Sequence, residues 1–387
     1  MDIKELRAIF LKTFGDSSEN LKVFFSPGRV NLIGEHTDYN GGWVFPCALS
    51  FGTYLAIRRR TDNTIKFVTS NFDYKASVDL GKIKEKHDKE WINYPLGVIN
   101  QLFNRGLKLG GMELYFSGNI PNGAGLSSSA SIEVVTAFAL NDIFDFGLDR
   151  IDLVKLSQKA ENEFCGVNCG IMDQFAVGMG KADHAIALEC DTLKYELVPV
   201  KLGDYRLVIA NTNKRRGLAD SKYNERRSEC DKAVEDINKF RPIKLLGELD
   251  YEEFASLQDH IPNETVRRRA HHVVSEIQRV KNAVASLKDG ALFEFGELMN
   301  ASHDSLRDDY EVTGIELDTL VEEARKIKGV IGSRMTGAGF GGCTVNLIHK
   351  DSIDKFHKQV AENYTKKTGL KPDFYTVEVG DGVKEIK

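Results

Sequence analysis

The chain has 387 residues, of which 42% are apolar and 28% charged. This composition is typical of a globular protein and excludes collagen-like, disordered and coiled-coil chains, and the length predicts roughly two or three domains. The formal net charge of −5 gives no reason to expect a nucleic acid or a bilayer as the main partner. Six scattered cysteines form no disulfide framework, which predicts a reduced, cytoplasmic protein.

Short apolar runs alternate with helical patterns over the first two hundred residues, and helix dominates afterwards. The first fourteen residues predict an amphipathic helix rather than a signal peptide. Further helices are expected at 95–105, 128–145, 151–164, over much of 221–328, and at 352–367. Strands are expected at 22–25, 52–58, 65–69, 112–117, 184–189, 193–198, 205–210, 343–348 and 373–379. These patterns predict an α+β fold in two lobes, residues 1–205 and 206–387.

The segment 119–131, NIPNGAGLSSSAS, lies between a predicted strand and a predicted helix and has the features of an anion cradle. Gly123 and Gly125 let backbone N–H groups turn inward, and the following helix N-terminus adds a positive dipole end. The three serines 127–129 can cap the helix, contact phosphate or bind a hard cation. A serine-capped helix after a glycine turn is the simpler alternative. The segment is not a Walker A loop, because the chain contains no GxxxxGK[ST] motif.

The segment 337–342, GAGFGG, formally matches the GxGxxG fingerprint of dinucleotide-binding folds. That fingerprint opens a helix, whereas the residues that follow here, CTVNLI, predict a strand. The dinucleotide interpretation therefore fails. The segment is either a tight turn with close backbone packing or a second loop that faces phosphates.

The segment 26–42, SPGRVNLIGEHTDYNGG, gathers Arg29, Glu35, His36 and Asp38 on a stretch that we expect to be irregular. Carboxylates accept protons from sugar hydroxyls, and an arginine can hold an anionic oxygen, so this set suits a polyhydroxylated ligand. The alternative is a solvated loop with local ion pairs, which is the commoner fate of such charges.

Three further residues could carry chemistry, and each has a plain structural alternative. Asp173, in CGIMDQF, is surrounded by apolar and small residues and is either a catalytic base or a helix cap. Glu161 falls on the helix face opposite an apolar stripe and is either solvent-exposed or a metal ligand. Tyr223 lies in the basic run 214–227, KRRGLADSKYNERR, for which a solvated helix face is the usual explanation.

Together these segments closely resemble the galactokinases, a family of the GHMP superfamily of small-molecule kinases that also holds homoserine, mevalonate and phosphomevalonate kinases. The segment 26–42 resembles the galactokinase signature, PNGAGLSSSAS the superfamily's phosphate-binding motif, and MTGAGFGGC its third motif. CGIMDQF, NTNKRRGLADSKYNERRSEC and MNASHDSLRDDYEVTG are similar to further galactokinase blocks. The resemblance runs from about Phe25 to Cys343.

The resemblance implies a fold in which the N-terminal lobe is similar to the second domain of ribosomal protein S5. The C-terminal lobe would be ferredoxin-like, with the active site in the cleft between the lobes. The implied reaction is ATP- and Mg²⁺-dependent phosphorylation of the C1 hydroxyl of α-D-galactose to galactose 1-phosphate. We expect no nucleic-acid or membrane partner, and a monomer or weak oligomer.

The resemblance also implies residue roles. Asp173 would be the base near the sugar C1 hydroxyl, and Arg29 would stabilise the transferring phosphoryl group. The sugar would be bound by Glu35, His36, Thr37, Asp38, Gly170 and Tyr223. The nucleotide would be bound by Ser70 and by the loop residues Gly123, Ala124, Gly125, Leu126, Ser127, Ser128 and Ser129. Ser129 and Glu161 would hold Mg²⁺.

Two other functions remain open from the sequence. One is a non-catalytic galactose- and ATP-binding sensor; known sensors of this type resemble galactokinases with a damaged phosphate loop, whereas residues 125–131, GLSSSAS, are intact. The other is a kinase for a related sugar such as N-acetylgalactosamine or L-arabinose, because the pocket wall that excludes a 2-acetamido group is not encoded in a motif.

Overall fold

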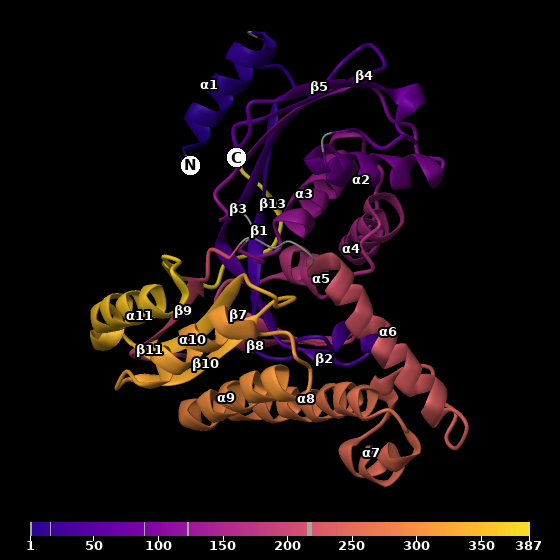
Figure 1. Cartoon of the computed structure of the whole chain (residues 1–387). Coiled ribbons are helices and arrows are strands. Elements are labelled where there is room, and N and C mark those ends of the chain that lie inside the picture. Colours follow the sequence, from indigo (N-terminus) through magenta and orange to yellow (C-terminus); the bar gives the residue numbers. More distant parts are fainter. Residues whose placement is uncertain (1, 16, 89, 122–123, 215–218) are drawn as a thin grey trace.

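A computed structural model of the chain describes residues 2–15, 17–88, 90–121, 124–214 and 219–387, and it has two lobes (Figure 1). The first lobe contains a six-stranded sheet in the order β13-β1-β3-β6-β4-β5, in which β4 and β6 are parallel and the other neighbours antiparallel. Its strands are β1 (Lys22–Asn31), β3 (Pro46–Arg59), β4 (Thr64–Thr69), β5 (Lys75–Asp79), β6 (Met112–Gly118) and β13 (Lys384–Glu385).

Helices cover both faces of this sheet, because neighbouring strand residues point to opposite sides. Phe24 joins the core under α2 (Asn93–Asn104), α3 (Ser128–Ile143), α4 (Arg150–Lys159) and the π-helix Ala160–Cys165. Its neighbour Val23 points to the other face and packs with Leu6 and Phe10 of α1 (Ile3–Phe14). Gly125, in the loop before α3, lies beside Gly337 of the second lobe, where a Cβ would be 3.1 Å from the Gly125 carbonyl oxygen.

A three-stranded sheet, in the order β2-β7-β8, lies between the lobes with α5 (Met172–Met179). Its strands are β2 (Trp43–Val44), β7 (His184–Glu189) and β8 (Tyr195–Pro199). Val44, Phe175 and Ile186 form a small core that holds α5 against this sheet. This packing fixes α5 beside β1, with which it is in contact.

The second lobe is built on an antiparallel four-stranded sheet in the order β10-β11-β9-β12. In chain order this is 2-3-1-4, the ferredoxin-like arrangement that we expected. Its strands are β9 (Tyr205–Asn211), β10 (Val330–Thr336), β11 (Cys343–His349) and β12 (Asp373–Val377). Its helices are α6 (Ala219–Ile237), α7 (Tyr251–Leu257), α8 (Glu264–Lys288), α9 (Leu292–Asp308), α10 (Gly314–Arg325) and α11 (Ile353–Thr368).

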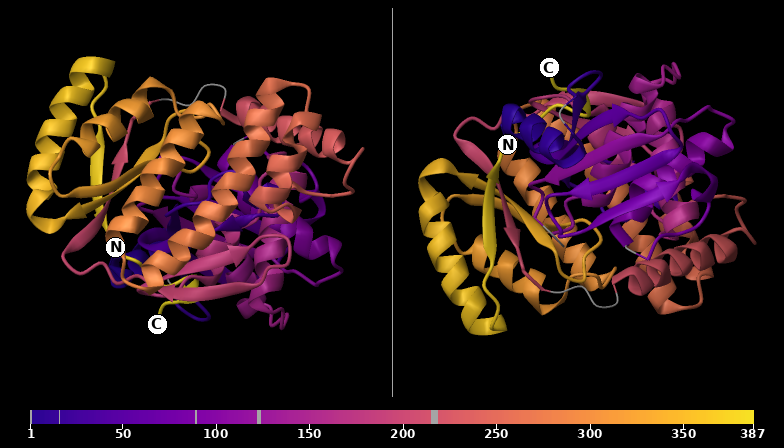
Figure 2. Two further views of the ribbon diagram at one scale, coloured as in Figure 1. Left: turned by 90° about the horizontal axis from the view of Figure 1, so that it is seen from below. Right: turned by 90° about the horizontal axis from the view of Figure 1, so that it is seen from above.

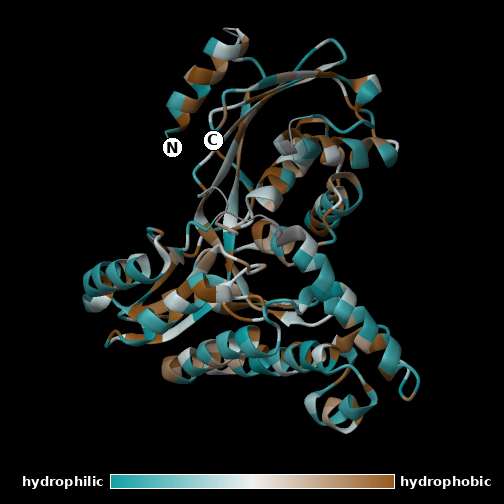
Figure 3. Cartoon of the chain, viewed as in Figure 1, coloured by the Kyte–Doolittle hydropathy of each residue, from teal (hydrophilic) through white to brown (hydrophobic). Residues whose placement is uncertain are grey.

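The helices of the second lobe lie on both sides of its sheet. Helices α10 and α11 pack on the face that carries Val208 and Ile348. Helices α8 and α9 run side by side and pack on the opposite face, where Ile209 and Val345 point (Figure 2). Figure 3 shows hydrophilic residues over much of α6 and α11, as expected for helices that are apolar on one side only.

Short 3₁₀ helices complete the fold at Asp38–Asn40, Leu80–Lys82, Glu90–Ile92, Leu246–Glu248, Gln258–His260 and Lys350–Ser352. None of the described helices is long and apolar enough to cross a bilayer. The expected α+β class in two lobes is confirmed, and the strand β13 at the end of the chain pairs with β1 of the first lobe. A domain boundary near residue 205 stays a prediction.

The structure corrects the expectation that residues 26–31 are irregular. They continue strand β1 to Asn31, with a shift of the pairing register between Pro27 and Arg29. The register shift sets the single residue Gly28 of β1 opposite three residues of β3, 49–51, so the extra residues of the bulge belong to β3. Strand β10 was not expected at all, because its sequence VIGSRMT lacks the alternation of a half-buried strand.

Candidate active site

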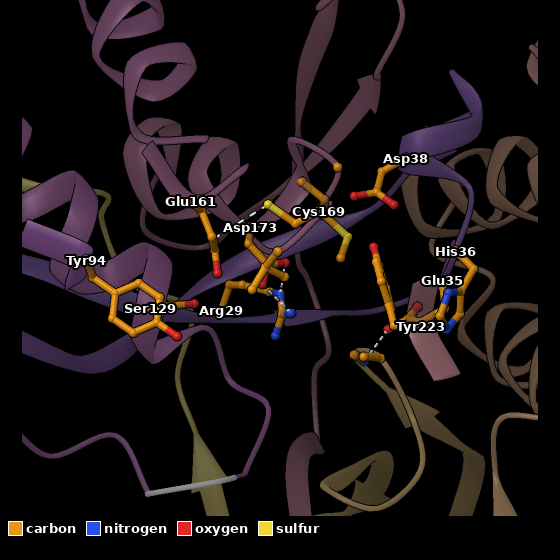
Figure 4. A pocket seen from close by; sticks show the side chains of 15 residues that line it. Arg29, Glu35, His36, Asp38, Tyr94, Ser129, Glu161, Cys169, Asp173 and Tyr223 are labelled. Atoms are coloured by element: carbon orange, nitrogen blue, oxygen red, sulfur yellow. Dashed lines mark hydrogen bonds and ion pairs between the residues drawn. The ribbon is translucent and has the colours of Figure 1, made fainter. Parts of the chain in front are cut away.

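Residues from six separate segments surround a cavity of about 260 Å³ (Figure 4). Arg29 comes from β1, Asp173 from α5, and Glu161 from the π-helix. The cavity is also lined by Glu35, His36, Asp38, Tyr94, Ser129, Cys169, Gly170, Tyr223, Gly337 and Ala338. The structure thus brings together most of the residues that the sequence singled out, although they span almost two hundred positions.

The Arg29–Asp173 pair lies at the centre of this cavity. Arg29 donates from Nε to Asp173 Oδ1 and from Nη2 to Oδ2, both at 2.8 Å, and from Nη1 to the Gly125 carbonyl at 2.7 Å. Ser127 donates to Asp173 Oδ2 at 2.5 Å. This two-pronged pairing fixes the orientation of the carboxylate and ties it to the loop before α3. The contacts found for the Asp173 carboxylate are with the side chains of Arg29 and Ser127, and its role as base stays a prediction.

Asp38 lies on the opposite side of the cavity from Ser129 and Glu161 (Figure 4). Burial, with a further contribution from the nearby Asp173 carboxylate, raises the pKa of Asp38 to about 6. Gly170 makes room for this side chain, since a Cβ at position 170 would overlap the Asp38 carboxylate. The two predicted sugar-binding residues therefore depend on each other sterically.

His36 and Tyr223 form an aromatic wall beside Asp38. Their ring centroids are 5.5 Å apart, and both rings contact Tyr39. Burial and the neighbouring His272 lower the pKa of His36 to about 3, so the imidazole is neutral. The basic run 214–227 was expected to be a solvated helix face. At Tyr223 this expectation is wrong, because the side chain is half-buried.

Glu35 is buried and bonded on both carboxylate oxygens. Asn31 Nδ2 and Arg334 Nη2 donate to Oε2 at 2.6 and 2.7 Å, whereas Thr336 Oγ1 and the Gly337 N–H donate to Oε1 at 3.0 and 2.7 Å. Glu35 thereby joins β1 to β10 and to the segment 337–342. The glycines of that segment have φ values of +78° to +124°, which a residue with a Cβ adopts only with strain.

Glu161 is buried, so the solvent-exposed position, one of the two alternatives from the sequence, is excluded. Burial and the Asp173 charge raise the pKa of Glu161 to about 7, and Ser129 lines the same cavity. Gln174 Nε2 donates to Glu161 Oε2 at 2.6 Å. A buried carboxylate beside a serine hydroxyl is a pair of hard oxygen ligands, so both residues could hold a divalent cation.

A second cavity of about 230 Å³ adjoins the first and shares Tyr94 and Ser129 with it. Its lining includes four aromatic side chains, Phe72, Trp91, Tyr94 and Phe116, together with Ser128 at the start of α3. The indole Nε1 of Trp91 is buried without a bonding partner among the described residues. Sequence reasoning missed these aromatic residues, because no spacing connects residues 72–94 with the loop before α3.

Some predicted site residues lie elsewhere or beyond the described part. Thr37 donates its hydroxyl to the carbonyls of Gly34 and Trp43 and so closes the turn before β2. Ser70 bonds to Ser117 at 2.6 Å, and its neighbours Thr69 and Asn71 line the second cavity. Ala124 and Leu126 are buried in the loop, whereas Gly123 lies outside the described residues.

Residues 8–59 match the galactokinase galactose-binding signature, residues 93–181 the N-terminal domain of GHMP kinases, and residues 283–366 the C-terminal domain of GHMP kinases. Galactokinase of Clostridium tetani is 56% identical over 387 residues, which cover 100% of this chain and 98% of that protein. Galactokinase of Bacillus subtilis is 50% identical and covers 99% of both chains.

The crystal structure of Lactococcus lactis galactokinase complexed with galactose matches with a TM-score of 0.96 and 48% identity, over 99% of this chain and 100% of that one. Methanococcus jannaschii mevalonate kinase matches with a TM-score of 0.64 and 19% identity, over 94% of this chain and 100% of that one, a likeness of fold alone. The signature match and the full-length identity agree, and the chain belongs to the galactokinase family of GHMP kinases.

Proposed function

We propose that the protein transfers the γ-phosphoryl group of ATP to the C1 hydroxyl of α-D-galactose, with Asp173 accepting the hydroxyl proton. The observation that carries this proposal is the Arg29–Asp173 pair. It lies between the candidate sugar residues Asp38, His36 and Tyr223 on one side and Ser129 and Glu161 on the other (Figure 4). Phosphoryl transfer requires this order of sugar, reacting groups and phosphates.

Asp173 retains capacity to act as the base. Its Oδ2 accepts from Arg29 and Ser127, whereas Oδ1 accepts only from Arg29 Nε among the described residues. Since each carboxylate oxygen can accept two bonds, Oδ1 has room for the sugar hydroxyl. As the oxygen–phosphorus bond forms and the bond from γ-phosphorus to its bridging oxygen breaks, the hydroxyl proton moves to Asp173. The two-pronged contact with the Arg29 guanidinium holds the Asp173 carboxylate in place for this step.

Arg29 stabilises the charge that develops on the transferring group. Three of its five N–H groups are bonded to Asp173 and Gly125 in the structure. The remaining hydrogens on Nη1 and Nη2 are available to phosphoryl oxygens. The N-terminus of α3, directly after the predicted phosphate loop, adds a positive dipole end on the same side.

The second cavity suits the base of ATP. An adenine ring can stack on its aromatic side chains, and Trp91, which lines it, has a buried N–H with no partner among the described residues. The shared residues Tyr94 and Ser129 connect this cavity with the site of transfer. We therefore assign adenine to the second cavity and the sugar to the first.

Ser129 and Glu161 fit Mg²⁺, because both supply hard oxygen ligands and Glu161 is held in the cavity by Gln174. No described cluster of three or more His, Cys, Asp or Glu residues surrounds a metal position. Such a pair is sufficient, since Mg²⁺ is usually bound by one or two carboxylates together with substrate phosphates. The ion would neutralise negative charge on those phosphates. A cytoplasmic, monomeric or weakly oligomeric protein stays a prediction.

The experiment that tests the substrate assignment is a comparison of sugars. Purified protein is incubated with Mg-ATP and galactose, glucose, N-acetylgalactosamine or L-arabinose in turn, and phosphorus NMR identifies the products. We expect a sugar 1-phosphate from galactose and little from the others. Equal turnover of N-acetylgalactosamine would assign a different sugar specificity, and tight galactose binding without any product would contradict phosphoryl transfer.

A further inference from the structure

Gln174 follows the proposed base in sequence, but its side chain is fully buried and does not line the cavity of the proposed sugar site. Its Nε2 donates to Glu161 Oε2 at 2.6 Å and to Glu133 Oε2 at 3.0 Å. Glu133 lies on α3 and is completely buried. One amide group therefore joins α3, α5 and the π-helix directly behind the cavity.

The orientation of this amide is determined by its neighbours. An amide nitrogen carries two hydrogens, and each can serve one of the two carboxyl groups. Rotation by 180° would remove both of these N–H donations. Gln174 Oε1 has no bonding partner among the described residues, so the side chain is held through its nitrogen.

The contacts of Glu161 show why such a support matters. Glu161 belongs to a π-helix, a segment type often found at functional sites. Its Oε2 contacts Gln174 and, more weakly, Cys169 Sγ at 3.6 Å. Of these two bonds, the one from Gln174 is the shorter, so Gln174 provides the closer contact that orients this carboxylate.

We propose that Gln174 is a positioning residue that aims the Glu161 carboxylate at the cation carried by the ATP phosphates, with Glu133 anchoring the Gln174 amide from behind. The inference rests on the proposed function, because it takes Glu161 as a metal ligand. Groups that orient a metal ligand typically contribute a factor of about 10–100 to metal affinity. The expected effect of losing the amide is of that size.

The test measures Mn²⁺ binding in the presence of ADP by electron paramagnetic resonance, so that no turnover is involved. Gln174→Met keeps the length of the side chain and removes the amide. We expect it to weaken Mn²⁺ binding by about 10–100-fold while galactose affinity, measured by calorimetry, stays within about twofold. Unchanged galactose binding also shows that the variant is folded.

Gln101→Met is the matched control. Gln101 is likewise buried and donates from Nε2 to a carboxylate of the same π-helix, Glu163 Oε2, at 3.0 Å. Glu163 is exposed and does not line the cavity described above. We expect Mn²⁺ affinity within about twofold of the parent protein. An equal loss in both variants would mean that the π-helix is merely destabilised and would overturn the inference.

Glu161→Gln separates this inference from the function on which it rests. If Glu161→Gln weakens Mn²⁺ binding and Gln174→Met does not, Gln174 has no positioning role and the metal assignment stands. If Glu161→Gln leaves Mn²⁺ binding unchanged, the metal assignment itself fails and the inference falls with it.

A second pair of variants tests the anchor and covers the case in which Gln174→Met does not fold. Glu133→Gln retains an acceptor for the Gln174 amide and is expected to bind Mn²⁺ like the parent. Glu133→Met removes the acceptor and is expected to weaken binding severalfold. Equal Mn²⁺ affinity in these two variants would overturn the anchoring role, because removal of the acceptor would then have no effect.

Discussion

The substitution Asp38→Asn is expected to stabilise the sugar-free protein while it damages function. The pKa of Asp38 rises from 3.8 to about 6 because the carboxyl is buried and lies near Asp173. A raised pKa means that the ionised form is less favourable in the folded than in the unfolded protein. At about 1.4 kcal/mol per pKa unit, ionised Asp38 costs about 3 kcal/mol of unfolding free energy well above pH 6.

The net gain is smaller than this cost. Asp38 accepts backbone N–H bonds from Tyr39 and Met172, and asparagine has only one acceptor oxygen. Loss of one such bond costs about 1–2 kcal/mol, so the expected gain is about 1–2 kcal/mol at pH 8. Below pH 4 the carboxyl is protonated in both states, and the gain disappears. The benefit should therefore grow between pH 4 and pH 7.

Denaturant or thermal unfolding of both proteins from pH 4 to pH 8 measures this difference. The matched control is Asp204→Asn, at an exposed residue whose pKa is lowered by its hydrogen bond to Lys350, so its pH dependence has the opposite sign. Galactose affinity of Asp38→Asn should fall by about 10-fold or more, since a charged acceptor is lost. A pH-independent difference, or a loss of stability at pH 8, would refute the reasoning.

Three further substitutions test other parts of the site. Arg29→Ala should lower kcat by about 10³-fold or more with a much smaller change in galactose KM, and a change confined to KM would restrict Arg29 to binding. Gly170→Ala should weaken galactose binding, because its Cβ displaces the Asp38 carboxylate; unchanged calorimetric affinity would contradict this steric role. Trp91→Leu should weaken ATP binding about 10-fold and leave galactose binding unchanged, whereas unchanged ATP affinity would remove adenine from the second cavity.

Local sequence signals predicted the helices and strands that are preceded by residues typical of a turn or a helix start. Helix α3 begins at Ser128 as expected, directly after the glycine- and serine-rich loop. Strand β11 follows the segment 337–342, as the residues CTVNLI predicted. The residues Arg29, Asp38 and Asp173 could be singled out by chemistry and by resemblance, but no sequence period places them around one cavity.

The errors have identifiable physical causes. The α-helical period placed Glu161 on the face opposite the apolar stripe. The segment from Ala160 is a π-helix, which rotates the side chains away from the α-helical positions, and Gln174 of α5 packs against Glu161. Strand β10 lacks apolar alternation because Arg334 is fully buried in a polar network, where it donates to Glu35 and Ser302. The burial of Glu161 and of Arg334 depends on contacts with segments that are distant in sequence. A periodic pattern describes only one helix or strand at a time and does not reveal such contacts.

The central claim is that Asp173 takes the proton from the sugar hydroxyl, and one variant tests it most directly. Asp173→Asn is compared with the parent protein in single-turnover transfer from Mg-ATP to galactose, followed by phosphorus NMR, with ATP binding measured separately. We predict that ATP affinity is retained while formation of galactose 1-phosphate slows by about 10²–10⁴-fold. A transfer rate close to that of the parent protein would contradict the role of Asp173 as the base.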